Sequence, residues 1–260
     1  MEGIGRGVAR GWRIVRTSFG FALLGAMSLL LAFVVLPLLR LWPEAGEQRE
    51  LRAQAATHWF ARAYLRALRI LRVLRIEYLG LEKLNEPGSL VVANHPTLLD
   101  VLVLLAAMPQ ADCVVKESYY TNPFLGGAAK GAGYIPSRDG PGIVAECVTR
   151  LRRGRSVVIF PEGTRSPPHE LGPFARGAAH ISLRAGCDPV PVTIRCDPVT
   201  LYKGQTWWDV PERCFTLTAA VAAPLLVKEA VLEPMSRPRD ARVLTAALRE
   251  HFERSLSVVR

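Results

Sequence analysis

The stretch Ser89–Asp100, with the sequence SLVVANHPTLLD, decides the fold that we expect for the rest of the chain. Its first five residues are small, β-branched or apolar and predict a short buried strand. Pro96 suits the first position of a helix, and the leucines after it recur at helical spacing. A strand that ends in a polar turn and leads into a helix is typical of an open α/β sheet. Such sheets carry their chemistry at the carboxyl ends of the strands.

The polar turn carries a histidine, His95, and an aspartate, Asp100, follows within the next helix. A carboxylate within reach of an imidazole can keep one ring nitrogen protonated and leave the other free to take a proton. The pair therefore predicts a general base. The same sequence is also consistent with a surface histidine and a solvated aspartate that have no catalytic role. The spacing alone does not distinguish this interpretation from a general base.

Expected strands and helices alternate from Leu79 onward, which predicts a mixed central sheet covered by helices. The strand candidates are Leu90–Ala93, Cys113–Lys116, Ser156–Phe160, Val190–Ile194 and Phe215–Val221. The helix candidates are Leu98–Ala107, Pro123–Gly131, Pro141–Arg152, Phe174–Ala185 and Arg239–Leu256. We therefore expect an α/β domain over residues 79–260, preceded by a membrane-associated helical region over residues 1–78.

The N-terminal region is expected to be embedded in a membrane. Thr17–Leu39 contains 23 residues without a charge, and as a helix it would measure about 34 Å, enough to cross the hydrocarbon core. Trp12 and Trp42 flank it as interfacial anchors do. A signal peptide also begins basic and turns apolar, but this run is long for one. Whether the segment spans the membrane or turns back at Pro37 stays open, since arginines lie on both sides.

A second helix is expected over Gln54–Glu77, with arginines on one stripe and apolar residues on another. Residues 1–80 hold twelve Arg and five Glu, so +7 of the net charge of +10 lies in the first third of the chain. Such an excess points to an anionic partner, either a membrane surface or a nucleic acid. We expect membrane lipids and no nucleic acid, because the arginines surround a long apolar run and no nucleic-acid-binding motif occurs.

The five cysteines are odd in number and widely spaced, and no C-x-x-C pair or Cys/His cluster occurs. This pattern predicts reduced, mostly buried thiols rather than a disulfide framework. It also predicts no metal site.

A second polar turn follows the strand expected at Ser156–Phe160. It carries Glu162, Gly163 and Arg165 in the sequence PEGTRS. An arginine and exposed backbone amides suit an anionic group such as phosphate. Because both turns follow buried strands, we expect this one on the same rim of the sheet as His95.

Four segments together resemble the glycerolipid (lysophospholipid) acyltransferase family, typified by bacterial 1-acyl-sn-glycerol-3-phosphate acyltransferase. Residues 94–100, NHPTLLD, are similar to the family's catalytic H-x4-D block, and residues 160–166, FPEGTRS, to its third block. Residues 133–138, GYIPSR, resemble the acceptor-binding block, and residues 189–192, PVPV, the fourth. The resemblance runs from about Leu79 to Thr218.

The resemblance implies transfer of an acyl group from acyl-CoA or acyl carrier protein to a hydroxyl of a lysophospholipid, with 1-acyl-glycerol-3-phosphate as the expected acceptor. His95 would take the proton from the acceptor hydroxyl, and Asp100 would orient the imidazole. The residues expected to hold the acceptor head group are Glu162, Gly163, Thr164 and Arg165. No cofactor beyond the acyl donor is implied. The implied location is a membrane of the bacterial inner-membrane type, with the catalytic domain on the cytoplasmic side.

The second block departs from the family pattern, in which the arginine stands seventh when counted from the glycine. Here Arg138 is sixth and Asp139 is seventh, and an aspartate in a phosphate site would repel the ligand. Lys116, at the end of its strand, is an alternative source of positive charge. The alternative functions are acyl transfer to a non-phosphatidate lipid or specialised metabolite, a membrane-bound hydrolase, and a lipid-binding protein without catalysis.

Overall fold

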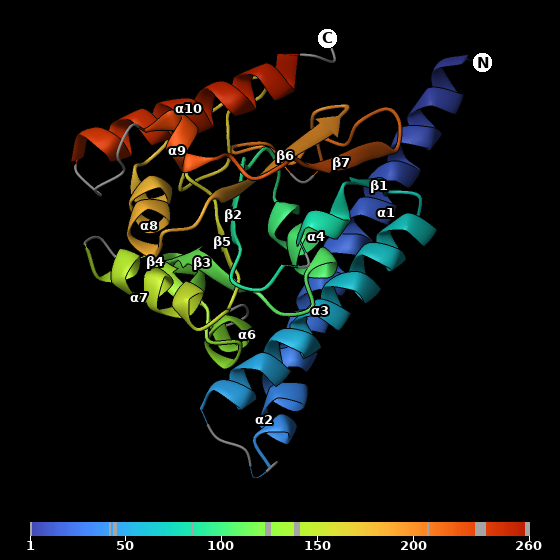
Figure 1. Ribbon diagram of the computed structural model, residues 1–260. Coiled ribbons are helices and arrows are strands. Elements are labelled where there is room, and N and C mark those ends of the chain that lie inside the picture. The colour runs from blue at the N-terminus through green and yellow to red at the C-terminus, as the bar shows by residue number, and fades with distance from the viewer. Residues whose placement is uncertain are drawn as a thin grey trace.

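The computed structural model describes residues 2–41, 43, 46–84, 86–122, 126–137, 141–206, 208–231 and 238–257. Its strands are β1 (Leu74–Leu79), β2 (Leu90–Ala93), β3 (Asp112–Lys116), β4 (Ile135–Ser137), β5 (Val157–Ile159), β6 (Pro189–Asp197) and β7 (Phe215–Val221). They form one sheet in the order β1-β7-β6-β2-β5-β3-β4 (Figure 1). Among these strands each neighbouring pair is parallel except β6–β7. The predicted mixed sheet is confirmed.

Helices cover both faces of the sheet, as predicted for this fold class (Figure 1). Successive side chains of a strand point to opposite faces. Leu90 and Val92 of β2 enter the apolar core beneath α7 (Pro141–Arg152), α8 (Gly177–Ala185) and α10 (Pro238–Ser257). Val91 and Ala93 enter the core on the other face, beneath α3 (Glu47–Ile70), α4 (Asp100–Ala107) and α6 (Gly126–Gly131). The remaining short elements are η2 (Leu81–Leu84), α5 (Glu117–Tyr120) and α9 (Val227–Ala230). Because β2 is buried on both faces, it lies at the centre of the domain.

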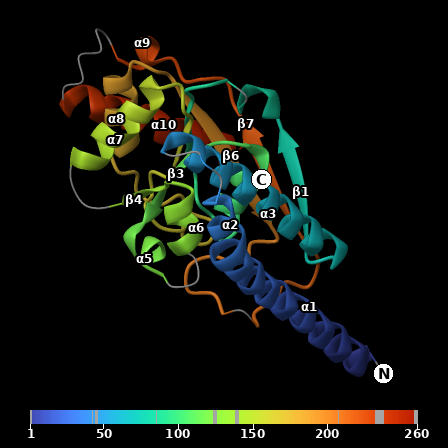
Figure 2. The ribbon, with the colours of Figure 1, turned by 90° about the horizontal axis from the view of Figure 1, so that it is seen from below.

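The N-terminal helix is longer than the apolar run predicted it to be. α1 (Glu2–Leu30) continues through a π-helical turn, η1 (Leu31–Val35), into α2 (Leu36–Leu39). Gly7–Leu39 is long and apolar enough to cross a membrane, and only 11% of its most apolar window is buried. α1 lies beside α3, and its N-terminal end projects beyond the domain (Figures 1 and 2). A helix that leaves its apolar surface outside the protein core suits a lipid environment better than an aqueous one. Trp42, the second predicted anchor, lies outside the described residues.

The predicted helix Gln54–Glu77 is wrong at its C-terminal end. α3 ends at Ile70, and the chain turns through Arg72, which has a φ of 54°. It then forms β1, which pairs with β7. The β1 side chains alternate between buried or half-buried residues, which are Leu74, Ile76 and Tyr78, and exposed ones, which are Arg75, Glu77 and Leu79. The sheet therefore includes residues 74–77, which we predicted to be helical. β4, only three residues long, was also missed.

A buried ion-pair cluster ties α3 to the sheet and to α7. Asp112, at the start of β3, is fully buried and receives two hydrogen bonds from Arg155, at 2.6 and 2.8 Å. Arg150 of α7 adds a third at 2.7 Å. Glu50 of α3 accepts a hydrogen bond from Arg155 at 2.7 Å, and Gln54 of α3 donates to Asp112 at 2.9 Å. The contacts satisfy the buried charges and fix α3 against the domain.

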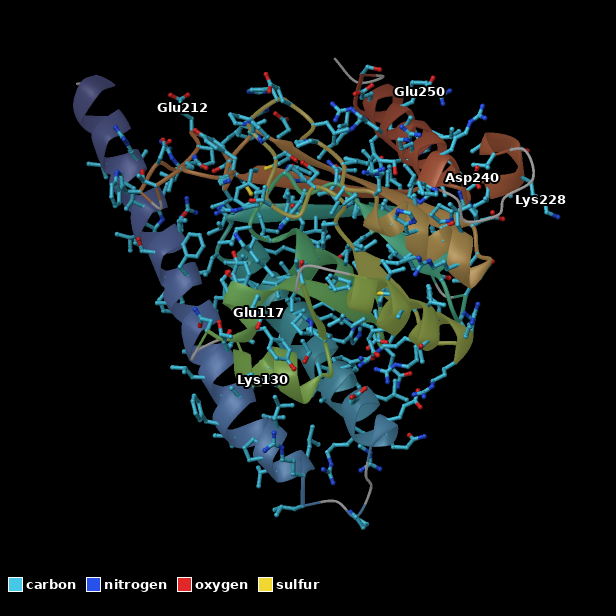
Figure 3. The ribbon with its side chains drawn as sticks, turned by 90° about the vertical axis from the view of Figure 1, so that its left-hand side faces the viewer. Glu117, Lys130, Glu212, Lys228, Asp240 and Glu250 are labelled. Atoms are coloured by element: carbon cyan, nitrogen blue, oxygen red, sulfur yellow. The ribbon has the colours of Figure 1, made fainter. Side chains whose placement is uncertain are left out.

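The short helices α5 and α6 lie close to α1. Figure 3 labels Glu117 of α5 and Lys130 of α6.

Candidate active site

His95 lies in the turn that follows β2, on the rim formed by the carboxyl ends of the parallel strands. The predicted helix start at Pro96 is wrong, because α4 begins at Asp100. Hydrogen bonds to the Asp100 carboxylate explain why the helix starts four residues later than predicted. The carboxylate accepts hydrogen bonds from the backbone N–H of Thr97 at 2.6 Å and from the Thr97 hydroxyl at 2.5 Å. These bonds close a turn ahead of the helix and hold the carboxylate in place.

The structure brings His95 and Asp100 together. Nδ1 of His95 lies 2.8 Å from Oδ2 of Asp100. Asp100 is fully buried, whereas the His95 side chain is 18% exposed. Burial raises the pKa of the Asp100 carboxyl, and the hydrogen bonds from His95 and Thr97 act in the opposite direction. An ionised carboxylate only accepts hydrogen bonds, so it holds the proton on Nδ1 and leaves Nε2 as the basic nitrogen.

Glu162 supports the His95 turn from behind. Its Oε1 accepts a hydrogen bond from the backbone N–H of His95 at 2.9 Å. Its Oε2 accepts from the Ser166 hydroxyl at 2.6 Å and from the N–H of Gly172 at 2.9 Å. A Cβ at position 172 would collide with this oxygen, so the close approach requires glycine. Glu162 is buried and does not line the cleft described below, although we predicted that it would hold the acceptor.

Arg165 reaches the same rim from the other side of that turn. Its Nη1 donates to the carbonyl oxygens of Leu201 and Tyr202, at 2.9 and 3.1 Å. These carbonyls belong to the loop of residues 198–214, which connects β6 to β7. The same Leu201 oxygen accepts a hydrogen bond from the N–H of Leu98 at 3.1 Å. Arg165 is half-buried and lines the cleft described below.

A cleft of about 630 Å³ opens at His95. Its polar lining includes Gly163, Thr164 and three cationic side chains, those of Lys116, Arg165 and Lys203. The carboxyl ends of β3, β5 and β6 bring these segments to one edge, which is the juxtaposition predicted from the two turns. Arg138 lies outside the described residues.

The rest of the cleft is apolar and reaches over both faces of the sheet. On one face it runs between α1, α3 and α4, along residues that include Met27, Phe60 and Leu102. On the other face it is bordered by Ile143 of α7 and Ile181 of α8. Apolar walls of this extent fit hydrocarbon, and the dyad lies where they meet the cationic rim.

Comparison with known proteins identifies the domain that carries this site. Residues 75–195 match the family model described as Acyltransferase. Residues 75–195 are thus similar to an acyltransferase domain, and we use that name for them below. The matched residues begin in β1 and end in β6, so they hold both turns and most of the rim.

Relatives of the acyltransferase domain occur in plants and bacteria. It is similar to the chloroplastic 1-acyl-sn-glycerol-3-phosphate acyltransferase BAT2 of Brassica napus, 31% identical over 144 residues, which are 53% of this chain and 42% of that protein. It is also similar to the 1-acyl-sn-glycerol-3-phosphate acyltransferase of Pseudomonas aeruginosa, 28% identical over 130 residues, 48% of this chain and 51% of that protein. The chain thus spans about half the length of the curated relatives that it matches.

A solved structure has the same fold as the whole chain. The 1-acyl-sn-glycerophosphate acyltransferase PlsC of Thermotoga maritima superposes with a TM-score of 0.69 and 19% sequence identity. The alignment covers 98% of this chain and 97% of that one, so it includes the N-terminal helices as well as the acyltransferase domain.

Several residues of the acyltransferase domain that shape the site were not predicted from the sequence. Thr97 positions Asp100, and Lys203 adds a cation to the rim. The Asn94 side chain is buried and exchanges two hydrogen bonds with the backbone of Ile194, which fixes the end of β2 to β6. Tyr134 lines the apolar cleft. Thr97 and Asn94 lie inside the H-x4-D block, so their closeness to His95 in the sequence could have indicated a role at the site. The sequence of the loop that carries Lys203 has no motif that would have indicated such a role.

Proposed function

We propose that this chain transfers an acyl group from acyl-CoA or acyl carrier protein to a hydroxyl of a lysophospholipid, with 1-acyl-glycerol-3-phosphate as the preferred acceptor. One observation carries the proposal: the His95–Asp100 pair lies where an apolar cleft meets a cationic rim. The names of the relatives in plants and bacteria support the same acceptor.

The chemistry follows from the two ring nitrogens of His95. Nε2 takes the proton of the acceptor hydroxyl as its oxygen attacks the thioester carbonyl of the donor. The new C–O bond forms, the C–S bond breaks, and the departing sulfur takes the proton back from the imidazolium. Asp100 stays ionised, fixes the ring through Nδ1 and stabilises the imidazolium while it exists. A positioned base of this kind contributes typically about 10²–10⁴-fold to the rate.

The rim supplies a place for the acceptor phosphate. Arg165, Lys116 and Lys203 come from three different segments and line the same cleft. Hydrogen bonds from cations to phosphate oxygens are short and strong, and a guanidinium can bind two oxygens at once. The exposed turn at Gly163 and Thr164 adds polar backbone beside Arg165. The role of Arg138 in this site stays a prediction.

The apolar part of the cleft is suited to the hydrocarbon chains of the reactants. A volume of about 630 Å³ is of the size that holds a large small-molecule ligand. Its wall includes α1, part of the apolar segment Gly7–Leu39, whose most apolar window is only 11% buried. A lipid that approaches from a bilayer around α1 would reach His95 without crossing water. This supports a membrane location; we place the acyltransferase domain on the cytoplasmic side of a bacterial-type inner membrane.

The test is a transfer assay with full-length protein in detergent. Labelled acyl-CoA or acyl carrier protein is supplied with lysophosphatidate, other lysophospholipids and a phosphate-free monoacylglycerol. We expect lysophosphatidate to give the diacyl product and His95→Ala to abolish it, while His169→Asn, at an exposed loop position, keeps full activity. Transfer by the His95→Ala protein would overturn the general-base mechanism. Equal use of phosphate-free acceptors would overturn only the acceptor assignment.

A further inference from the structure

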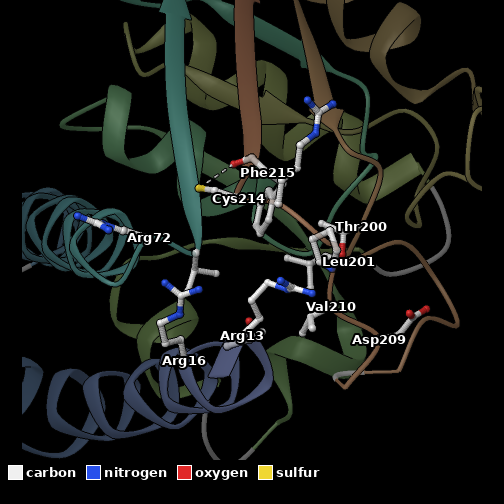
Figure 4. A pocket seen from close by; sticks show the side chains of 13 residues that line it. Arg13, Arg16, Arg72, Thr200, Leu201, Asp209, Val210, Cys214 and Phe215 are labelled. Atoms are coloured by element: carbon white, nitrogen blue, oxygen red, sulfur yellow. Dashed lines mark hydrogen bonds between the residues drawn. The ribbon is translucent and has the colours of Figure 1, made fainter. Parts of the chain in front are cut away.

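A second, smaller hollow lies between the N-terminal half of α1, the turn after α3 and the loop of residues 198–214 (Figure 4). Its volume is about 30 Å³, against about 630 Å³ for the cleft at His95, and the two linings share no residue. Room of this size admits a group of a few heavy atoms and excludes an acyl chain. The charged residues that line it are Arg13, Arg16, Arg72, Arg213 and Asp209.

Two of these arginines lie on α1 and line the hollow. Figure 4 shows that Arg13 extends from α1 toward Leu201 and Val210, with Arg16 one turn further along the helix. Within the described part of the chain, Nε of Arg13 and Nε of Arg16 are buried and have no hydrogen-bond partner. Arg16 uses Nη1 on the carbonyl of Leu71, at 3.3 Å. Guanidinium groups keep their charge and their donors at any physiological pH, so Arg13 and Arg16 can donate hydrogen bonds to an anionic ligand in the hollow.

The local charge balance favours an anion. Arg213 is already paired with Asp197 at 2.8 Å on the surface. Arg13, Arg16 and Arg72 also line the hollow, and Asp209 is the acidic residue of the lining. Glu212 lies on the same loop near α1, exposed to solvent (Figure 3). The hollow keeps an excess of positive charge, which attracts an oxyanion with several acceptor atoms.

We propose that this hollow binds a phosphate group, and that its source is the head group of a membrane phospholipid other than the substrate. The neighbours of the hollow carry the argument for a lipid. Trp12 and Trp208 are 60% and 50% exposed on α1 and on the loop, and tryptophan favours the head-group level of a bilayer. The guanidinium of Arg16 lies 5.9 Å from the centre of the Trp12 ring. The apolar surface of α1 begins at this level and continues along the helix.

The hollow adjoins the catalytic rim through one residue. Leu201 lines the hollow, and its carbonyl oxygen accepts the hydrogen bonds of Arg165 and Leu98 at the edge of the cleft. A phosphate bound by Arg13 would therefore rest against the loop that also supports the acceptor site. The site needs no acyl transfer in order to be filled, so its test is a binding measurement without an acyl donor.

The experiment titrates full-length protein in a neutral detergent with short-chain phosphatidylglycerol and follows binding by calorimetry. Parallel titrations use inorganic phosphate and CoA. Arg13→Gln removes one charge from the hollow, and Arg66→Gln removes one from an exposed position on α3 outside it. We expect Arg13→Gln to weaken lipid binding at least tenfold and Arg66→Gln to leave it within twofold of the unmodified protein.

The three ligands distinguish the source of the phosphate. Lipid binding that depends on Arg13, without Arg13-dependent binding of inorganic phosphate or CoA, supports the head-group assignment. Arg13-dependent binding of CoA or inorganic phosphate keeps the phosphate site and overturns the lipid source. Equal affinities of the Arg13→Gln and Arg66→Gln proteins for all three ligands overturn the site itself. These results leave the transfer assay unaffected, so the two proposals fail separately.

Discussion

The carboxylate of Glu162 accepts a hydrogen bond from the backbone N–H of His95 over 2.9 Å. The carbonyl of His95 in turn accepts one from the N–H of Ser166, at 2.8 Å. The two turns of the rim are therefore joined directly, and the second one fixes the backbone of the proposed base. Both carboxylate oxygens of Glu162 accept hydrogen bonds from groups of the protein. We therefore expect Glu162 to affect the reaction by positioning His95, not by contacting the substrate.

Glu162→Gln tests this relationship. The amide nitrogen of glutamine cannot accept a hydrogen bond, so at least one buried donor loses its partner, at a cost of about 1–3 kcal/mol in the free energy of unfolding. We expect a lower Tm and a lower kcat, with the KM for the acceptor nearly unchanged. Glu170→Gln, at an exposed position of the same loop, is the matched control. A change confined to the acceptor KM would instead indicate that Glu162 contacts the head group.

Thr97→Val removes the hydroxyl that donates to Oδ1 of Asp100 and keeps the size of the side chain. A hydrogen bond to a charged group contributes about 1.5–3 kcal/mol, so we expect roughly a 10–100-fold loss of kcat because Asp100 is less well positioned. Thr97→Ser keeps the hydroxyl and should recover most of the activity. Steady-state kinetics of both variants provide the measurement, and a Thr97→Val protein as active as the unmodified protein would show that the hydroxyl is not required.

Asp100→Asn separates the charge of this residue from its hydrogen bonds. An asparagine can still accept from the N–H of Thr97 and from Nδ1 of His95, so the fold is preserved while the imidazolium loses its counter-charge. We expect kcat to fall by about 10²–10⁴-fold. A loss smaller than threefold would show that the charge on Asp100 is not required.

The same variant has a defined pH dependence of stability. Burial raises the pKa of Asp100, so the folded protein holds this proton more tightly than the unfolded chain does. Ionisation of Asp100 therefore lowers the free energy of unfolding as the pH rises from the unfolded value of 3.8 to the raised folded value. Asp100→Asn has no such ionisation and does not lose this stability. The difference between the Tm of the variant and the Tm of the unmodified protein should therefore be more positive at pH 7 than at pH 4. A difference in Tm that is independent of pH would contradict the raised pKa.

Arg165→Ala and Lys116→Ala test the cationic rim. Removal of a charge-assisted contact to phosphate costs about 1.5–3 kcal/mol, which corresponds to roughly 10–100-fold in kcat/KM for a phosphate-bearing acceptor. We expect smaller losses with a phosphate-free acceptor, because that acceptor never makes the contact. Arg165→Ala also frees the carbonyls of Leu201 and Tyr202, so its Tm must be measured alongside. Lys116 is exposed, and its removal should leave the Tm unchanged.

Local patterns predicted most of the sheet and the proposed base. The five strands expected from apolar runs are all present, and the strand predicted at Phe215–Val221 has the observed bounds. β1 was missed because the three-residue spacing of the arginines in α3 continues through Arg72 to Arg75, which lies in β1. The first residues of β1 therefore fit a helical pattern as well as a strand pattern. Pro96 was misread as a helix start because the hydrogen bonds that close the turn come from side chains whose partners the sequence does not display.

The sequence by itself determined the fold class, the apolar N-terminal helix and the proximity of His95 and Asp100, because each depends on residues close together in the chain. Only the tertiary structure decided what surrounds the pair. The bond from His95 to Glu162 joins residues 67 positions apart, and the loop that holds Arg165 comes from beyond β6. Hydrogen bonds and pockets of this kind depend on the three-dimensional packing of strands whose order, β6-β2-β5-β3, differs from their order in the chain. Sequence periodicity records which residues are buried, but not which distant residues they meet.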